Sequence, residues 1–209
     1  MYILLRILSI FTNIFRQSNV LYKTVKENTV KLYPPYKIRD SRIGAYTYIA
    51  FNAQIRNTTI GKFCSIGPNF FSGWGIHPTN GISSSPLFYS TKKQNGFTLS
   101  KTDKIEERKS IKIGNDVFIG ANVFVIDGIS IGDGAVIGAG TVVSKDVPPY
   151  GIAVGNPMKI LKFRFSDEII AKLLDIKWWD FPKEKLPFVE KYFFDIDGFI
   201  EQCENKNAN

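Results

Sequence analysis

A six-residue repeat governs the middle of this chain. From Ile111 onwards the sequence divides into IKIGND, VFIGAN, VFVIDG, ISIGDG, AVIGAG and TVVSKD, and the third residue of every segment is Ile or Val. A period of six matches neither the 3.6-residue period of a helix nor the two-residue period of one long strand. It is typical of a parallel β-helix, in which short strands separated by corners wind around a column of stacked aliphatic side chains.

Three such segments make one triangular coil of 18 residues, so residues 18 positions apart are expected to stack in the column. The same spacing begins upstream at Ile43 and contains one step of five, from Ile55 to Ile60. Gly is frequent directly after the aliphatic residue, and we expect it to supply backbone conformations that other residues resist. The predicted stacked pairs are Ile113 with Ile131, Ile119 with Ile137, and Val125 with Val143.

The repeat is interrupted between residues 71 and 110, a segment rich in Gly, Ser, Pro and Lys. A loop of this length inside a solenoid is more often functional than decorative. The predicted fold is therefore all-β with helical ends. It has an N-terminal amphipathic helix and basic segment in residues 1–37, a parallel β-helix in 38–158 with the excursion 71–110, and a C-terminal helical extension in 159–209.

Both ends of the chain carry helical patterns. MYILLRILSIFTNIFRQ places apolar residues on one helix face, but Arg6 interrupts the run, which is too short to span a bilayer. This helix is expected to cover a core, an oligomer contact or a membrane surface. Near the C-terminus, Ser166 is expected to cap a helix, and Trp178 and Trp179 to pack against the coil. The polar tail in residues 201–209 is expected to fray.

The charge distribution favours an anionic partner. The chain carries a net charge of +8, and residues 1–42 hold eight Lys or Arg against two acids. A membrane surface, a nucleotide or a phosphorylated substrate would suit this end. No motif typical of nucleic-acid binding accompanies the charge, so we expect no nucleic-acid partner. Two isolated thiols, Cys64 and Cys203, fit a reduced cytoplasmic protein, and one His without a close Cys pair argues against a metal site within one chain.

Four features together resemble the hexapeptide-repeat acetyltransferases over about residues 38–200. They are the repeat, an excursion that opens with His77 and Pro78, the passage AVIGAGTVVSKDVPPYGIAVGNPMK, and the closing LLDIKWWDFP. The resemblance is strongest to the branch that holds type B chloramphenicol and streptogramin acetyltransferases and bacterial polysaccharide O-acetyltransferases. It implies a left-handed parallel β-helix, a homotrimer, and acetyl-CoA bound in a groove between subunits. We expect a cytoplasmic protein, with possible contact with the inner membrane face through its N-terminal helix.

His77, the only histidine, matches the catalytic residue of that family. A neutral imidazole can remove the proton of a hydroxyl that attacks a thioester, while backbone N–H groups stabilise the oxyanion. An already activated thioester needs no cysteine nucleophile, and Cys64 is interpreted as a small buried residue. A backbone carbonyl or an acid of the excursion could orient the ring. The acids there, interpreted as solvated charges, are Asp103, Glu106 and Glu107.

The resemblance also implies cofactor and substrate residues. Two alanines one coil apart, Ala121 and Ala139, are expected beside the pantetheine arm of CoA. A serine and four cationic residues are expected near the arm, the adenine end or the phosphates. The predicted cofactor-binding residues are Ala121, Ala139, Ser144, Lys145, Lys159, Lys162 and Arg164, and the predicted substrate residues are Tyr46, Tyr48 and Trp74.

Three alternatives remain open at this point. The antibiotic-modifying relatives usually carry His-Arg in the excursion, so His-Pro favours a sugar or glycan acceptor over chloramphenicol or a streptogramin. Zinc held by three copies of His77 on a trimer axis would give a different chemistry. An inactive β-helix scaffold is the non-enzymatic alternative, and the presence of both His77 and the Lys-rich segment argues against it.

Overall fold

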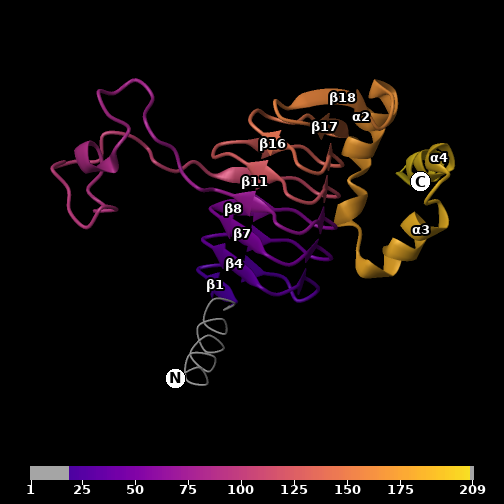
Figure 1. The fold of residues 1–209 in the computed structure, drawn as a ribbon. Helices are drawn as coiled ribbons and strands as arrows, with labels where there is room; N and C mark the ends of the chain where they lie inside the picture. Colours follow the sequence, from indigo (N-terminus) through magenta and orange to yellow (C-terminus); the bar gives the residue numbers. More distant parts are fainter. Residues whose placement is uncertain (1–18, 208–209) are drawn as a thin grey trace, which may run out of the picture.

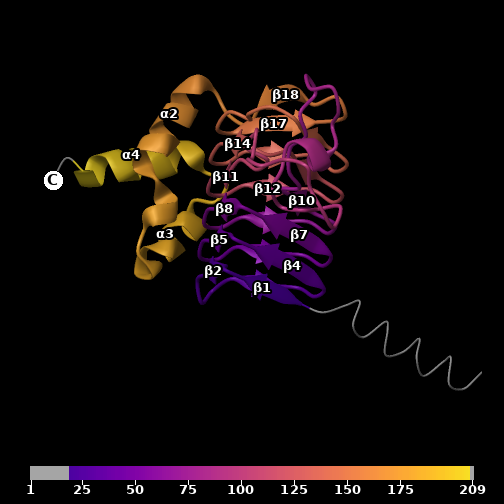
Figure 2. The same cartoon turned by 90° about the vertical axis from the view of Figure 1, so that its left-hand side faces the viewer.

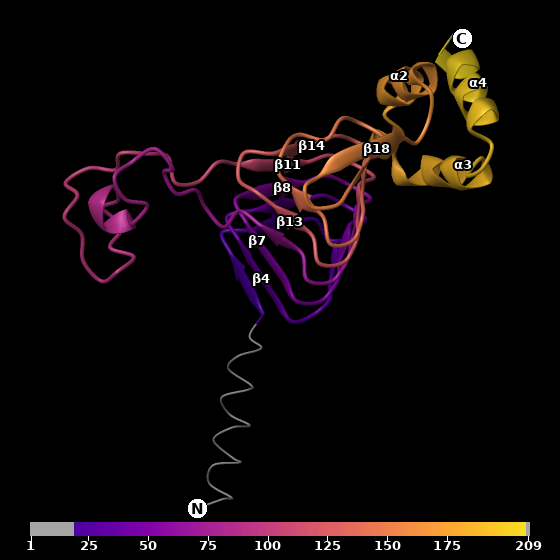
Figure 3. The same cartoon turned by 45° about the horizontal axis from the view of Figure 1, so that its top comes forward.

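Successive repeat segments lie on three different sheets in a computed structural model that describes residues 19–207. Strands of these sheets pair in parallel throughout, except at the last strand, and the chain forms the predicted left-handed β-helix. Seen obliquely from its C-terminal end, the coil has a triangular outline (Figure 3). The N-terminal amphipathic helix lies outside the described residues.

We name the sheets A, B and C in the order in which the chain visits them. Sheet A contains β1 (Val20–Tyr22), β4 (Tyr36–Arg39), β7 (Ala53–Arg56), β10 (Phe71–Ser72), β13 (Phe124–Val125) and β16 (Val142–Val143). Sheet B contains β2 (Val25–Lys26), β5 (Arg42–Ile43), β8 (Thr58–Ile60), β11 (Ile111–Ile113) and β14 (Ser130–Ile131). Sheet C contains β3 (Lys31–Leu32), β6 (Tyr48–Ile49), β9 (Ser65–Ile66), β12 (Phe118–Ile119), β15 (Val136–Ile137), β17 (Gly151–Val154) and β18 (Lys159–Phe163).

The aliphatic column is confirmed. All three predicted pairs are strand partners, and each of their six side chains is at most 3% exposed. Below the excursion the coils are one residue shorter, because the step of five makes partners such as Ile43 and Ile60 17 positions apart. Ile60 then pairs with Ile113, so the column continues across the excursion without a break.

The repeat glycines have two roles: Gly134 and Gly140, at the ends of their segments, have the predicted left-handed backbone, whereas those directly after the aliphatic residue have another role. Gly120 does not have a positive φ; a Cβ at this position would lie 2.6 Å from the backbone N of Ala139 in the next coil. Close approach of successive coils therefore requires this Gly. The left-handed backbone comes two residues later, at Asn122 with φ of 58°. Asn tolerates this region better than most residues.

The coil begins earlier and ends later than the predicted boundaries at 38 and 158. Val20 pairs with Lys37, so much of the segment predicted to be a separate N-terminal part forms the first coil. At the other end β18 returns antiparallel to β17 and closes sheet C. The Pro34–Pro35 and Asn156–Pro157 peptide bonds are cis.

Three helices follow and pack at the corner between sheets B and C (Figures 1 and 2). They are α2 (Asp167–Ile176), α3 (Leu186–Lys191) and α4 (Ile196–Asn207). Ser166 caps α2 as predicted, since its side chain accepts a hydrogen bond from the Ile169 N–H. Trp178 packs against Phe63 of the coil, with 5.0 Å between their ring centroids, and Trp179 is buried.

The tail predicted to fray instead continues α4 to Asn207, and the Cys203 side chain is buried in a second core. This core also contains Tyr150, Leu173, Phe199 and Ile200, and it is separate from the aliphatic column. The polar composition of the tail gave no sign that Cys203 would be buried, and residues 208 and 209 of the tail lie outside the described residues. Within residues 19–207, no helix combines the length and apolar character needed to cross a membrane.

Candidate functional site

The excursion leaves the coil between β10 and β11, at the corner between sheets A and B (Figures 1 and 3). Its outgoing and returning legs are joined at the root. Arg108 Nη1 donates to the Gly73 carbonyl at 2.8 Å, and the Ile76 N–H donates to the Glu107 carbonyl at 2.8 Å. Asp127, from the next coil, accepts a hydrogen bond from the Gly75 N–H at 2.9 Å. The root is therefore fixed to the coil.

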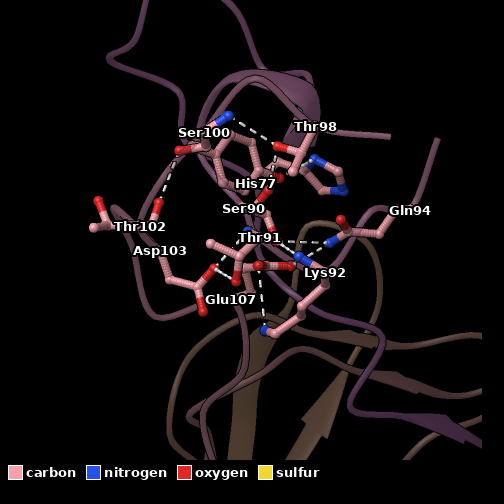
Figure 4. A network of polar contacts seen from close by, with 11 residues as sticks. His77, Ser90, Thr91, Lys92, Gln94, Thr98, Ser100, Thr102, Asp103 and Glu107 are labelled. Atoms are coloured by element: carbon pink, nitrogen blue, oxygen red, sulfur yellow. Dashed lines mark hydrogen bonds and ion pairs between the residues drawn. The ribbon is translucent and has the colours of Figure 1, made fainter. Parts of the chain in front are cut away.

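Beyond the root, the excursion contains one short 3-10 helix, η1 (Pro86–Phe88), and is held largely by side-chain hydrogen bonds (Figure 4). Asp103 Oδ1 accepts from both the N–H and the hydroxyl of Thr91, and these bonds lower the pKa of its carboxyl group. Gln94 donates to Glu107 Oε2 at 2.7 Å, and Lys92 lies 3.2 Å from Glu107 Oε1. Such bonds give the excursion a defined conformation despite its lack of periodicity.

Two groups of the same excursion hold the His77 ring. Nδ1 lies 3.0 Å from the carbonyl oxygen of Ser84 and 2.9 Å from the hydroxyl of Tyr89. A carbonyl can only accept, so its contact requires the Nδ1–H tautomer, and this assignment rests on the contact geometry. Nε2 is then the unprotonated nitrogen, and it has no hydrogen-bond partner among residues 19–207.

Tyr89 is the residue that sequence reasoning missed. Its side chain is 5% exposed, and burial together with the charge of Glu107 raises its pKa. The phenol therefore keeps its proton at neutral pH and can contact both the neutral imidazole and the imidazolium. A single Tyr in an aperiodic segment carries no sequence signal for such a contact. The predicted alternative of a backbone carbonyl as the orienting group is present, as Ser84.

Neither Asp103 nor Glu107 contacts His77, and each has other partners. The interpretation of Glu107 as a solvated charge is wrong, because its side chain is only 11% exposed and is paired with Lys92 and Gln94. Cys64 is buried as expected, with its Sγ 3.1 Å from the Gly114 carbonyl. Burial raises the pKa of this thiol to about 12, which keeps it protonated and unreactive.

Three of the predicted cofactor residues meet at the corner between sheets C and A. Ala121 and Ala139 follow β12 and β15, and the Gly140 N–H donates to the Ala121 carbonyl at 2.8 Å. Lys159 begins β18 at the same corner, opposite Val154. A ladder of amides supports this corner, with Asn52 donating to Asn69 and Asn69 to Asn122.

The other predicted cofactor residues lie elsewhere. Ser144 and Lys145 follow β16 at the corner from which the excursion departs, and both are exposed. Lys162 pairs with Ile152 farther along β18. Arg164 is already engaged at the corner between sheets B and C: its Nη1 donates to Asp116 at 3.0 Å and to the Gly134 carbonyl at 2.8 Å. Burial raises the pKa of Asp116, and Arg164 opposes this effect.

The predicted substrate residues are also spread over the surface. Tyr46 stacks on Phe63 at 4.9 Å beside the C-terminal helices, which is a packing role. Tyr48 is exposed on sheet C, and Trp74 is 64% exposed at the root of the excursion. Of the three, Trp74 is nearest to His77 along the chain. Among residues 19–207 no group of three or more His, Cys, Asp or Glu side chains is placed to hold a metal ion.

Comparison with known proteins identifies a consistent set of relatives. The profile described as the hexapeptide repeat of succinyl-transferase matches residues 110–145. A probable macrolide acetyltransferase of Lysinibacillus sphaericus is 41% identical over 153 residues, which cover 70% of this chain and 82% of that protein. A chloramphenicol acetyltransferase of Escherichia coli is 43% identical over 137 residues, covering 62% of this chain and 64% of that protein.

Solved structures extend the similarity to a cofactor complex and a sugar-modifying enzyme. A hexapeptide-repeat acetyltransferase of Vibrio cholerae complexed with acetyl-CoA is 27% identical, with a TM-score of 0.53, and the match covers 70% of this chain and 73% of that one. A maltose O-acetyltransferase of Clostridium difficile 630 is also 27% identical, with a TM-score of 0.54 over 70% and 72% of the two chains. The chain spans less than two thirds of the length of the chloramphenicol acetyltransferases that it matches.

Proposed function

Because this chain belongs to the hexapeptide-repeat acetyltransferases, we propose that it transfers the acetyl group of acetyl-CoA to a hydroxyl of a sugar or glycan. The observation that carries this proposal is the geometry of His77. Its Nδ1 is held by Ser84 and Tyr89, its Nε2 has no partner in the described part of the chain, and the excursion that carries it extends away from the coil (Figure 1).

In the proposed reaction, Nε2 of His77 removes the proton of the acceptor hydroxyl as the oxygen attacks the thioester carbonyl. The C–S bond then breaks, the ester forms, and the departing thiolate of CoA takes the proton back from the imidazolium. Nδ1–H donates to Ser84 throughout, which holds the ring in one orientation. The Tyr89 hydroxyl lies beside the charge that develops on the ring.

The cofactor is proposed to bind along the corner that carries Ala121, Ala139 and Lys159. This corner and the root of the excursion are different corners of the same triangular coil (Figure 3). A single chain therefore does not bring His77 beside the cofactor residues. We propose that a homotrimer does so, with the excursion of one subunit reaching the corner of its neighbour.

Exposed apolar side chains on the excursion support the proposal that it packs against a neighbouring subunit. Ile82 is fully exposed, and Phe97 and Leu99 are 58% and 65% exposed. Exposed apolar residues clustered on one segment are typical of an interaction surface. Light scattering tests this part of the proposal: a trimer is expected, and a monomer with full activity would contradict it.

The antibiotic acceptors are the second candidate, since the curated relatives are named as chloramphenicol and macrolide acetyltransferases. The His77-Pro78 pair, where antibiotic-modifying relatives usually carry His-Arg, favours the sugar acceptor, and the maltose O-acetyltransferase supports it. The test measures release of free CoA from acetyl-CoA with a panel of sugars and with chloramphenicol, and identifies the acetylated product by mass. Release with chloramphenicol alone would refute the sugar acceptor, and release with neither would refute the transferase.

The cofactor assignment has its own test. Lys159→Glu is expected to raise KM for acetyl-CoA by roughly tenfold to a hundredfold, because it removes a charge-assisted contact to phosphate worth about 1.5–3 kcal/mol. The matched control is Lys26→Glu, an exposed lysine of β2 on sheet B. An equal increase in KM for the acceptor would place Lys159 outside the cofactor site.

A further inference from the structure

A groove at the root of the excursion brings four cationic side chains together with polar and apolar neighbours. It has a volume of about 280 Å³, and its walls come from β4, β7 and the two legs of the excursion. We call it the basic groove, and its charged and aromatic residues are Lys37, Arg39, Arg56, Trp74 and Arg108. No acidic residue lines it.

The cations of the basic groove are brought together by strand register. Arg39 and Arg56 are direct partners on neighbouring parallel strands, about 4.8 Å apart at the backbone. Lys37 lies two residues before Arg39, on the same outward face of β4. Like charges placed opposite each other destabilise a sheet. The coil thus carries a local electrostatic cost that an anionic ligand would relieve.

Neighbouring acids offset little of this charge. Within residues 19–207 neither Lys37 nor Arg39 has an ion-pair partner. Arg56 Nε lies 3.7 Å from Asp40, with both side chains about 40% exposed, and such surface pairs contribute little. Arg108 uses Nη1 to hold the Gly73 carbonyl, which leaves other N–H groups of its guanidinium free to donate.

The basic groove lies close to the proposed catalytic base. Trp74 is three residues before His77, so their Cα atoms are at most about 11 Å apart, because an extended chain spans about 3.6 Å per residue. The joined legs of the excursion fix this separation. The exposed Trp74 ring offers a flat apolar surface at the edge of the groove. A sugar ring between the groove and His77 could therefore present a hydroxyl to Nε2.

We propose that the basic groove binds an anionic substituent of the acceptor, a phosphoryl or a carboxylate group, and that the acceptor is therefore a negatively charged sugar. The inference rests on the proposed function for the identity of the reaction. The binding site itself stands on the register of Arg39 and Arg56 and on the walls of the groove. Planar guanidinium groups match both carboxylate and phosphate oxygens, often through paired hydrogen bonds.

Direct binding tests this inference without any activity. Calorimetry would compare glucose 6-phosphate, glucuronate and N-acetylneuraminate with glucose, for the wild type and for Arg39→Gln. We expect at least one charged sugar to bind the wild type tenfold or more tightly than glucose, and Arg39→Gln to remove that preference. Comparing the affinity for glucose 6-phosphate with the affinities for glucuronate and N-acetylneuraminate shows whether the groove prefers a phosphoryl or a carboxylate group. The control is Arg42→Gln, an exposed arginine of β5 on sheet B that should keep the preference.

Two results would overturn the inference. One is equal binding of charged sugars and glucose to the wild type. The other concerns Arg39→Gln. If this substitution raises KM for acetyl-CoA as much as it raises KM for a charged acceptor, the groove binds the cofactor instead of the acceptor. These outcomes are separate from failure of the proposed function. If the protein acetylates neutral sugars as well as charged ones, the proposed acetyltransferase activity stands, and the proposed role of the basic groove is refuted.

Discussion

The coil and the excursion hold their shapes by different interactions. In the coil, backbone hydrogen bonds join each turn to the next around a column whose side chains are nearly all buried, such as Ile60 and Ile119 at 1% and 0% exposure. In the excursion, side chains such as Asp103 and Gln94 supplement a few backbone hydrogen bonds, while Ile82 and Trp74 are exposed. The comparison separates the region that holds the buried column from the region that holds the proposed catalytic base.

The largest expected effect tests the chemical side of that division. His77→Ala is expected to lower kcat by about 10²- to 10⁴-fold, because it removes the proposed general base. The free energy of unfolding should change little, since the ring is exposed and outside both cores. The measurement is steady-state kinetics together with urea unfolding, and Lys101→Ala, an exposed residue of the same excursion, is the control. An unchanged kcat would remove His77 from the mechanism.

The second prediction tests the structural side. Ile60→Ala is expected to lower the free energy of unfolding by about 2–5 kcal/mol, because it leaves a cavity in the column between Ile43 and Ile113. Thr59→Ala, the exposed neighbour on the same strand, should change it by less than about 0.5 kcal/mol. Denaturant unfolding measures both. Equal effects would mean that the column does not dominate the stability of the coil.

The third prediction concerns the contact that holds the base. Tyr89→Phe is expected to lower kcat by roughly tenfold to a hundredfold, because the Tyr89 oxygen shares the single Nδ1 proton with the Ser84 carbonyl and a hydrogen bond to a charged group contributes about 1.5–3 kcal/mol. The acid limb of the pH–rate profile should also move, which a purely structural residue would not cause. Tyr33→Phe, an exposed tyrosine of the coil, should leave both unchanged. An unshifted profile with normal kcat would limit Tyr89 to packing.

The smallest effect returns to the coil. Burial raises the pKa of Cys64 from 9.0 to about 12, so the folded state keeps a proton that the unfolded thiol loses above pH 9. The folded state then binds more protons, and the free energy of unfolding should fall as pH rises through this window, by up to about 1.4 kcal/mol per pH unit. Urea unfolding between pH 8 and 10 should show a shallower decline for Cys64→Ala. Parallel declines would contradict the assignment.

Sequence reasoning succeeded where the chain is periodic. The stacked pairs from Ile113 to Val143, the burial of Cys64 and the Ser166 cap each follow from local spacing or residue type. It was less successful where one residue serves a distant partner. Gly120 permits close packing against the next coil, and Arg164 is engaged by Asp116, a residue far away in sequence.

The sequence by itself determined the coil, because a six-residue period with an aliphatic residue in phase leaves one efficient way to bury those side chains. It also determined that the excursion contains the only imidazole. Only the tertiary structure decided what surrounds that imidazole, because the excursion has no period and its contacts depend on how distant residues fold together. The contact of Tyr89 with Nδ1 and that of Arg108 with the Gly73 carbonyl are results of that folding.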